Sequence, residues 1–342
     1  MKTPFETRVL TSAEELNAIA EEWTELFKFC RDATPFQRPE WLQPWIEIFC
    51  PEKIRAIEVR REGGLVGLAP LLIYPRGEER VLAFSGGGVS DYLNILVAPP
   101  NEDEIISAMF QQIRNLADWT VLDLTDLPAY SVLRRTELVH SATPHDTCST
   151  LFLPSTKNEL VHLFSKHQRA NLRNARSRLE RIGGGEVEVA TDKTLPEFLD
   201  DLFRLHTSRW SQSGEPGVLA DPEIKTFHRR AAPKLLAKGI LRLSRLRTRD
   251  GTIAVLYTLL GQSTLFCYMQ GYDPEFAFLS PGTLLMYSAI ENAVDSGMGK
   301  FDFLRGDEAY KRHWLAQNEN TFRIQFSGSN YIYVGGLQDV AA

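Results

Sequence analysis

The spacing of apolar positions predicts the first helix of the chain. Leu16, Ile19 and Trp23 recur at helical spacing directly after a capping-box sequence at residues 12–15. A capping box followed by one apolar face is typical of an amphipathic helix with a defined start. We therefore expect a helix here, with its apolar face packed into a core.

Alternating apolar residues at 54–60 and 65–74 flank the pair Gly63-Gly64. Two such runs around a glycine turn predict a β-hairpin. The same reasoning extends the first half of the chain with several further elements. These are strands at 81–84, 92–97 and 120–124 and a helix at about 102–116.

The second half repeats this order of elements. A turn and a long apolar strand at 250–259 match those at 63–72 in style. A helix followed by a strand with an aspartate between apolar neighbours also recurs, at 283–303 as at 102–126. A duplicated unit constrains the fold more than local propensity does, so we expect two related domains.

The length of 342 residues also suggests two domains, because single cores rarely grow so large. A strongly basic helix is predicted at 165–181, followed by the glycines at 183–185, which are typical of a helix end. We place the boundary in this region and expect domains at 1–150 and 151–342.

Composition and charge narrow the class of protein. With 43% hydrophobic residues and no apolar run of the roughly 20 residues that a membrane span needs, the chain is typical of a soluble globular protein without integral membrane contact. A net charge of -6 disfavours a surface devoted to nucleic acid. The N-terminal residues lack an apolar signal core, so we expect a cytoplasmic protein with reduced thiols.

The four cysteines and seven histidines show no metal-ligand spacing, so we expect no metal site. The strongest candidate for a site is the segment 301–311, which carries six ionisable side chains. Its first residues alternate as a strand does, Gly306 can adopt an unusual turn, and Asp307 can cap a helix starting at Glu308. We interpret it as the edge of an active site, with an ordinary strand-to-helix junction as the alternative.

Two further segments can bind anions. Ser280-Pro281-Gly282-Thr283 reads as a helix start, where free amides and the helix dipole attract negative charge. The alternative is that this segment only caps the helix and binds no ligand. On the predicted basic helix, Arg169, Arg173 and Arg176 fall on one face, where they could bind phosphates or simply face solvent.

Several stretches of the second half together resemble the tandem GNAT-like acyltransferases, in particular the cellulose-biosynthesis-type (CelD/BcsL) acetyltransferases. The same layout is similar to the Fem peptidyltransferases. The resemblance implies an α/β fold of two tandem GNAT-like domains, each a mixed, mostly antiparallel sheet flanked by helices, with the acyl donor at the splayed middle of one sheet. The matching stretches are 165–173, 205–210, 280–285, 301–303 and 306–311.

This resemblance implies acyl transfer, with Tyr310 as the general acid. Asp302 is the candidate general base if burial raises its pKa, and Glu308 could act through a water molecule. Both carboxylates have a structural alternative, as a backbone-bonded residue or as an ion-pair partner of Lys311.

For the donor, we expect Ser280, Gly282, Thr283 and Lys311 to hold the phosphates of acetyl-CoA or another acyl-CoA, with no permanently bound cofactor. The usual Arg/Gln-x-x-Gly-x-Gly/Ala phosphate loop of GNAT proteins is absent, and residues 272–279 take its place. This departure keeps open an aminoacyl-tRNA donor, as the Fem relatives use.

On the acceptor side, we expect Arg169, Arg173, His206 and Trp210 to contact the substrate. The alternatives are a hydrogen-bonded structural role for His206 and a core position for Trp210. The glycine-rich turn that leads to Asp91 and Tyr92 is a further candidate. The sequence thus favours an acyltransferase of the N-acetyltransferase type, acting on an amine or hydroxyl of a small molecule, sugar or nucleotide sugar. The alternatives are Fem-like peptidyl transfer from charged tRNA and a catalytically silent scaffold in polysaccharide biosynthesis.

Overall fold

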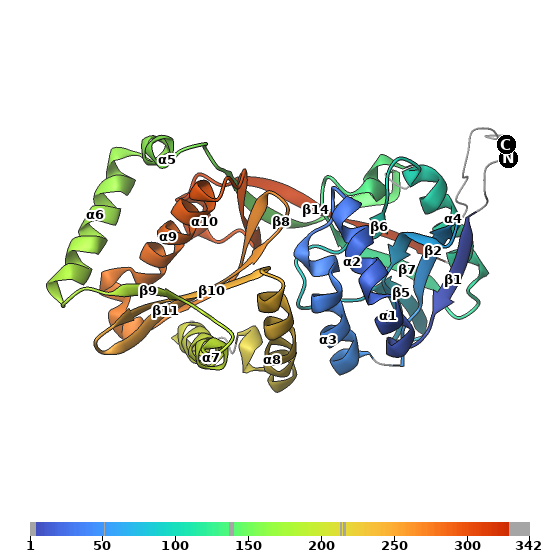
Figure 1. Ribbon diagram of the computed structural model, residues 1–342, viewed down its shortest axis with the longest axis horizontal. Helices are drawn as coiled ribbons and strands as arrows, with labels where there is room; N and C mark the ends of the chain where they lie inside the picture. The colour runs from blue at the N-terminus through green and yellow to red at the C-terminus, as the bar shows by residue number, and fades with distance from the viewer. Residues whose placement is uncertain (1–4, 51, 137–139, 213, 215–216, 328–342) are drawn as a thin grey trace. The chain divides into compact units, whose positions relative to one another are not determined.

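The computed structural model describes residues 5–50, 52–136, 140–212, 214 and 217–327, and the chain divides into two units (Figure 1). Unit 1 comprises Met1–Asp146 and Asn320–Ala342, and unit 2 comprises Thr147–Glu319. Strands β8 (Ala142–Phe152) and β14 (Gln317–Ser327) each continue from one unit into the other. The chain therefore returns to unit 1 after completing unit 2, which the division at 150 and 151 did not anticipate.

Unit 1 contains a four-stranded sheet in the order β1-β2-β3-β6 and a second group of strands in the order β4-β5-β7-β14. Strands β5 and β7 are parallel, and the other described pairs are antiparallel. The strands are β1 (Glu6–Leu10), β2 (Ala56–Arg61), β3 (Gly64–Ala69), β4 (Leu71–Arg76), β5 (Glu79–Phe84), β6 (Leu96–Val97) and β7 (Val121–Leu127).

Two helices of unit 1, at residues 20–29 and 102–115, contact these strands. Ser12 caps the first helix by accepting a hydrogen bond from the Glu15 backbone, as the capping box predicts. The predicted single helix is divided in two at Ile19, which ends one helix and precedes the next. The helices are α1 (Ala13–Ala18), α2 (Ala20–Phe29), α3 (Pro39–Phe49) and α4 (Glu102–Asn115), with 3₁₀ turns η1 (Pro35–Gln37) and η2 (Val132–Arg135).

The predicted hairpin is confirmed, since β2 and β3 pair antiparallel from Ile57 with Ala69 to Arg61 with Gly64. The prediction that 65–74 is one strand is wrong, because the run breaks at Pro70. Proline cannot donate to a ladder, and the following residues, β4, pair with β5 instead. The strand predicted at 92–97 is reduced to the two residues of β6.

Unit 2 is built on a mixed sheet in the order β8-β13-β12-β11-β10-β9. Only the β12 and β13 pair is parallel among its described pairs. The expected mixed, mostly antiparallel sheet is thus confirmed. Its further strands are β9 (Glu186–Val189), β10 (Leu241–Thr248), β11 (Gly251–Leu260), β12 (Thr264–Tyr272) and β13 (Lys300–Arg305).

Helices cover both faces of this sheet. Figure 1 shows α9 on one side of β10 and β11 and α7 with α8 on the other. Helix α6 packs on α9 rather than on the sheet, and most of its side chains are exposed. The helices are α5 (Lys157–Leu163), α6 (Lys166–Arg181), α7 (Leu195–Gln212), α8 (Pro222–Ala237), α9 (Pro281–Asp295) and α10 (Ala309–Arg312), with 3₁₀ turns η4 (Val218–Ala220) and η5 (Pro274–Leu279).

Candidate active site

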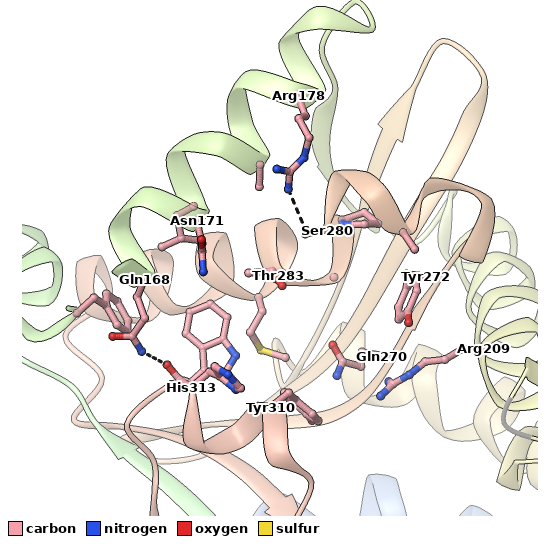
Figure 2. Close-up of a pocket in the computed structure, with 18 residues that line it drawn as sticks. Gln168, Asn171, Arg178, Arg209, Gln270, Tyr272, Ser280, Thr283, Tyr310 and His313 are labelled. Carbon is pink, nitrogen blue, oxygen red and sulfur yellow. Dashed lines mark hydrogen bonds between the residues drawn. The ribbon is translucent and has the colours of Figure 1, made fainter. Parts of the chain in front are cut away.

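A cavity of about 610 Å³ lies in unit 2, beside the C-terminal part of β12 and the start of α9 (Figure 2). Strands β12 and β13 pair in parallel only from Thr264 with Lys300 to Phe266 with Asp302. Gln270 and Tyr272, which lie beyond this paired stretch on β12, line the cavity. The cavity therefore opens next to the parallel pair, where a splayed sheet was expected to hold the donor.

The lining combines two arginines with polar and apolar side chains. Of the described residues that line it, none is an aspartate or a glutamate, in a chain whose net charge is -6. Such a cavity suits an anionic ligand. It is lined by Phe164, Gln168, Asn171, Leu172, Ala175, Arg178, Arg209, Gln270, Tyr272, Ala277, Ser280, Pro281, Gly282, Thr283, Met286, Tyr310, His313 and Trp314.

The start of α9 forms one wall, and it contains three of the predicted donor-binding residues, Ser280, Gly282 and Thr283. Ser280 has a left-handed backbone with φ of 55°, and its side chain makes no capping hydrogen bond. The alternative of plain capping by Ser280 is therefore wrong. The first amides of a helix have no partner within the helix, so they can serve an anion in the cavity.

Arg178 from α6 reaches the same wall and donates a hydrogen bond to the Ser280 hydroxyl over 3.3 Å (Figure 2). Its Nε is buried without a hydrogen-bond partner among the described residues. Arg178 was not among the predicted site residues, because the predicted arginine stripe lies on a different face of the same helix. The signal was present, since Gln168, Asn171, Ala175 and Arg178 also recur at helical spacing.

The predicted stripe of Arg169, Arg173 and Arg176 lies outside the cavity lining. Arg173 and Arg176 are exposed, Arg169 is partly exposed, and Arg176 pairs with Glu291 over 3.4 Å. The opposite side of α6 is held near the cavity at its first turn, where the Gln168 amide donates to the backbone carbonyl of His313. Two polar contacts, made by Gln168 and by Arg178, therefore hold helix α6 along the cavity.

Tyr310, the predicted general acid, lines the cavity at the start of α10. Burial raises the pKa of its hydroxyl far above the ordinary value, and the nearby Cys267 and Glu308 add to this shift. Arg209 and a hydrogen bond with Gln270 act in the opposite direction. Tyr310 therefore keeps its proton at neutral pH and can donate it.

The other predicted members of this segment lie outside the lining. Asp302 is buried, and its carboxylate accepts a hydrogen bond from the Leu304 amide over 2.7 Å. Glu308 is exposed and pairs with Lys311 over 2.8 Å. Gly306 has the expected unusual backbone, with φ of 107°. Asp307 does not cap the short helix, because Glu308 occupies the N-cap position and the Asp307 carboxylate pairs with Arg312 instead.

Lys311 differs most from its predicted role as a phosphate ligand. Its side chain is only 2% exposed. Its ammonium group donates to the carbonyls of Leu304, Arg305 and Gly306. The lysine therefore fixes the turn between β13 and α10, and its hydrogen-bonding capacity is already used there.

Helix α7 contributes Arg209 to the cavity, a residue that the sequence did not single out. The predicted acceptor residues His206 and Trp210 lie next to it on α7 and stand 6.0 Å apart between ring centroids. Neither lines the cavity. Burial, with a smaller effect of Arg209, lowers the pKa of His206 to about 4.

Asp91 and Tyr92 belong to unit 1, whereas the residues that line the cavity belong to unit 2. Tyr92 is buried there, and its carbonyl accepts a hydrogen bond from the Gln37 amide. Their predicted contact with an acceptor stays a prediction. Among the described residues, no group of three or more His, Cys, Asp or Glu side chains could hold a metal ion. No described helix has the length and apolar character needed to cross a membrane.

Comparison with known families gives a match for most of unit 2. Residues 166–312 match the family model described as the acetyltransferase (GNAT) domain. No curated protein matches the chain. The cavity-lining residues from Gln168 to Tyr310 all lie within the matched segment.

Solved structures share the fold of the whole chain at low sequence identity. FemX has a TM-score of 0.66 at 13% identity, covering 93% of this chain and 97% of that one. The C-terminal domain of a putative lysylphosphatidylglycerol synthetase from Agrobacterium fabrum has a TM-score of 0.57 at 11% identity, covering 91% and 92%.

A tandem GNAT protein from the clavulanic acid biosynthesis pathway has a TM-score of 0.51 at 14% identity, covering 98% of this chain and 100% of that one. Likenesses at this level of identity establish the fold. The chain thus has a tandem GNAT-like fold, and its residues 166–312 carry the match to a GNAT acetyltransferase domain.

Proposed function

We propose that the protein is an acyltransferase that moves an acyl group from acyl-CoA to an amine or hydroxyl of a small molecule or saccharide. The observation that carries this proposal is the cavity beside the β12 and β13 pair, whose described lining holds two arginines and no carboxylate. The match of 166–312 to the GNAT acetyltransferase domain supports it. Membership of the cellulose-biosynthesis subgroup and a cytoplasmic location remain proposals that rest on the sequence.

The donor's phosphates would bind at the start of α9. The amides of Gly282 and Thr283 and the positive end of a 15-residue helix attract negative charge. Arg178 adds a full positive charge at the same wall. In this proposal Arg178 supplies charge that the absent phosphate loop would otherwise provide.

The chemistry follows from the groups that face the cavity. An uncharged amine or a hydroxyl of the acceptor attacks the thioester carbonyl, and the bond between carbon and sulfur breaks. The Tyr310 hydroxyl gives its proton to the departing thiolate, and the proton released by the acceptor can restore the tyrosine. The raised pKa of Tyr310 favours this role as an acid over a role as a base.

Isothermal titration with acetyl-CoA, coenzyme A and a short-chain acyl-CoA tests the donor. We expect saturable binding in the native protein and a loss of about tenfold or more in affinity in Arg178→Gln, since a hydrogen-bonded charge pair is removed. Gly282→Asp should abolish binding by placing a negative charge at the helix start. Arg181→Gln, on the exposed side of α6, is the matched control. Absence of acyl-CoA binding at millimolar concentration would refute the proposal.

A second candidate is acyl transfer from aminoacyl-tRNA, which the partly exposed Arg169 and the exposed Arg173 on α6 favour. Binding through phosphates would be steeply salt-dependent. Filter binding of charged tRNA at two salt concentrations, with Arg169→Gln and Arg173→Gln, distinguishes it from acyl-CoA use. A silent scaffold would bind neither donor, and its cellular role would survive Tyr310→Phe.

A further inference from the structure

Arg209 occupies the opposite side of the cavity from Arg178. Figure 2 shows Arg178 beside Ser280 at the start of α9, and Arg209 beside Gln270, Tyr272 and Tyr310. The cavity therefore has two separate cationic regions. The donor's phosphates, in the proposed function, account for only the first of them.

The position of Arg209 is fixed by close packing of α7 on β12. Gly271 allows this approach, because a Cβ at that position would lie 2.6 Å from the His206 amide nitrogen and 2.7 Å from the Leu205 carbonyl carbon. Arg209 follows His206 by one helical turn and so reaches the strand residues that flank Gly271. These are Gln270 and Tyr272, both of which line the cavity.

The guanidinium of Arg209 has no carboxylate partner within the described parts of the chain. Its Cζ stands 5.7 Å from the centroid of the Tyr272 ring. By contrast Arg204, also on α7, pairs with Asp201 over 2.8 Å. A partly buried charge without a counter-ion is costly, and an anionic ligand that enters the cavity would offset that cost.

The neighbours of Arg209 place it near Tyr310, the proposed general acid of the acyl transfer. Its charge acts on the hydroxyl of Tyr310, where burial is the larger influence on the pKa. The Arg209 guanidinium lies over the ring of Tyr272. A guanidinium binds a carboxylate through two parallel hydrogen bonds, whereas a phosphate is better served by the helix start at the other wall.

We propose that Arg209 binds a carboxylate of the acceptor, so that the substrate is an amine or hydroxyl compound carrying an acid group, such as an amino acid or an amino sugar acid. This inference rests on the proposed function. It makes Arg209 a specificity-determining residue that holds the acceptor's acid group while the nucleophile faces the thioester beside Tyr310.

One test needs no turnover and no known acceptor. The side-chain Nε–H signal of Arg209, assigned by its loss in Arg209→Gln, is followed by NMR as acetate is added to the coenzyme A complex, with chloride as the comparison. We expect a saturable shift with acetate at this signal and none at Arg204, the matched control on the same helix. A signal of Arg209 that does not respond to acetate would overturn the proposal.

A second test measures acetyl transfer to acceptors in pairs that differ only in the acid group, such as amino acids and their amides, and amino sugar acids and amino sugars. We expect kcat/KM to favour the acid member by about 100-fold, the worth of a bidentate charged contact. Arg209→Gln should reduce the ratio to within a few-fold, Arg209→Lys should keep part of it, and Arg204→Gln all of it.

The outcomes separate this inference from the proposed function. Equal loss of activity toward both members of a pair in Arg209→Gln would assign Arg209 to the transition state and overturn the inference. A native preference for phosphorylated over carboxylated acceptors, or a loss of acetyl-CoA affinity in Arg209→Gln, would overturn it as well. If acyl-CoA fails to bind the native protein, the proposed function fails, whereas the acetate titration can still be read without coenzyme A.

Discussion

At the scale of single residues, Tyr310 is the group on which the proposed chemistry depends. Tyr310→Phe removes the proton donor and leaves the ring, which packs edge-on to Phe303 at 6.5 Å between centroids. We expect kcat to fall by about 100-fold, within the range for loss of a general acid, while acetyl-CoA affinity stays within twofold. Steady-state kinetics and calorimetry on the same preparation check both values.

An unchanged kcat in Tyr310→Phe would exclude the tyrosine as the acid. A thermal melt distinguishes a chemical effect from unfolding, and we expect the two melts to coincide within a few degrees. Tyr272→Phe is the matched control, because it removes a hydroxyl from the same cavity without removing the proposed acid.

His206 gives stability a dependence on pH. Burial, with Arg209 adding a smaller effect, lowers its pKa to about 4, whereas an unfolded histidine titrates near 6.5. The unfolded chain therefore binds the proton more readily between these values. The stability that the neutral His206 provides is complete above pH 6.5 and is lost as the pH falls toward 4, with a slope of up to about 1.4 kcal/mol per pH unit.

Urea unfolding at pH 7 and pH 5 measures this dependence. His206→Gln should have the smaller change in the free energy of unfolding between the two pH values. His228, whose pKa burial lowers to about 3, keeps part of the dependence in that variant. His167→Gln, at an exposed position of α6, should behave as the native protein does. An identical pH dependence in His206→Gln would contradict the assignment.

The candidate site was predictable where local sequence carries the signal. Gly282 and Tyr310 stand at recognisable helix starts, and the cavity contains both. Arg178 and Arg209 were missed because their importance depends on which helix face meets the cavity, which is a tertiary property. Lys311 was predicted to bind a phosphate because the charged residues around it are typical of an exposed segment. Its burial against three backbone carbonyls depends on tertiary structure, which the local sequence does not show.

At the scale of elements, the packing of α7 on β12 depends on the absence of a side chain at Gly271. A methyl group there would lie within 2.7 Å of two backbone atoms of α7, which cannot move independently of the helix. We expect Gly271→Ala to destabilise the protein by about 1–3 kcal/mol, as overpacking does. Thermal unfolding measures this cost.

Gly282→Ala is the matched control for stability, because its new Cβ meets its neighbours at 3.7 Å, an ordinary contact distance. We expect the two variants to differ clearly in melting temperature. Equal melting temperatures would mean that α7 can shift from β12 at no cost, and the precise placement of Arg209 would then lose its explanation.

The elements that were predicted have a strong apolar periodicity, as in the β2 and β3 hairpin and in β11. The errors have local causes. Pro70 interrupts a run whose apolar pattern continues through it, so that β3 and β4 join different sets of partners. The residues before β6 are buried without strand pairing, and burial alone resembles a strand in the sequence.

At the scale of the whole molecule, the return of the chain at Asn320 completes unit 1. Arg323 on β14 donates two hydrogen bonds to Asp123 on β7, at 2.6 and 2.7 Å, and Arg76 donates a third. Burial alone would raise the pKa of Asp123, but these arginines hold it below its ordinary value. This contribution to stability is present above about pH 4 and is lost at lower pH.

Arg323→Met leaves the buried Asp123 with one arginine. We expect the free energy of unfolding to fall by about 3 kcal/mol, as when one partner of a buried ion pair is removed, and acid unfolding to begin at a higher pH. Denaturant titrations at pH 7 and pH 4.5 check both effects. Arg249→Met, which breaks an exposed pair with Asp250, should change stability little. A similar effect of both substitutions would contradict a structural role for the returning strand.

The passage of the chain through both units has a consequence for its synthesis. The ribosome finishes all of unit 2 before it makes residues 320–327, which supply β14 to unit 1. All the residues of unit 2 are therefore made before unit 1 has its last strand. Unit 1 is thus the first unit to begin synthesis and the last to be completed. Until residues 320–327 are made, the edge of β7 that pairs with β14 stays uncovered.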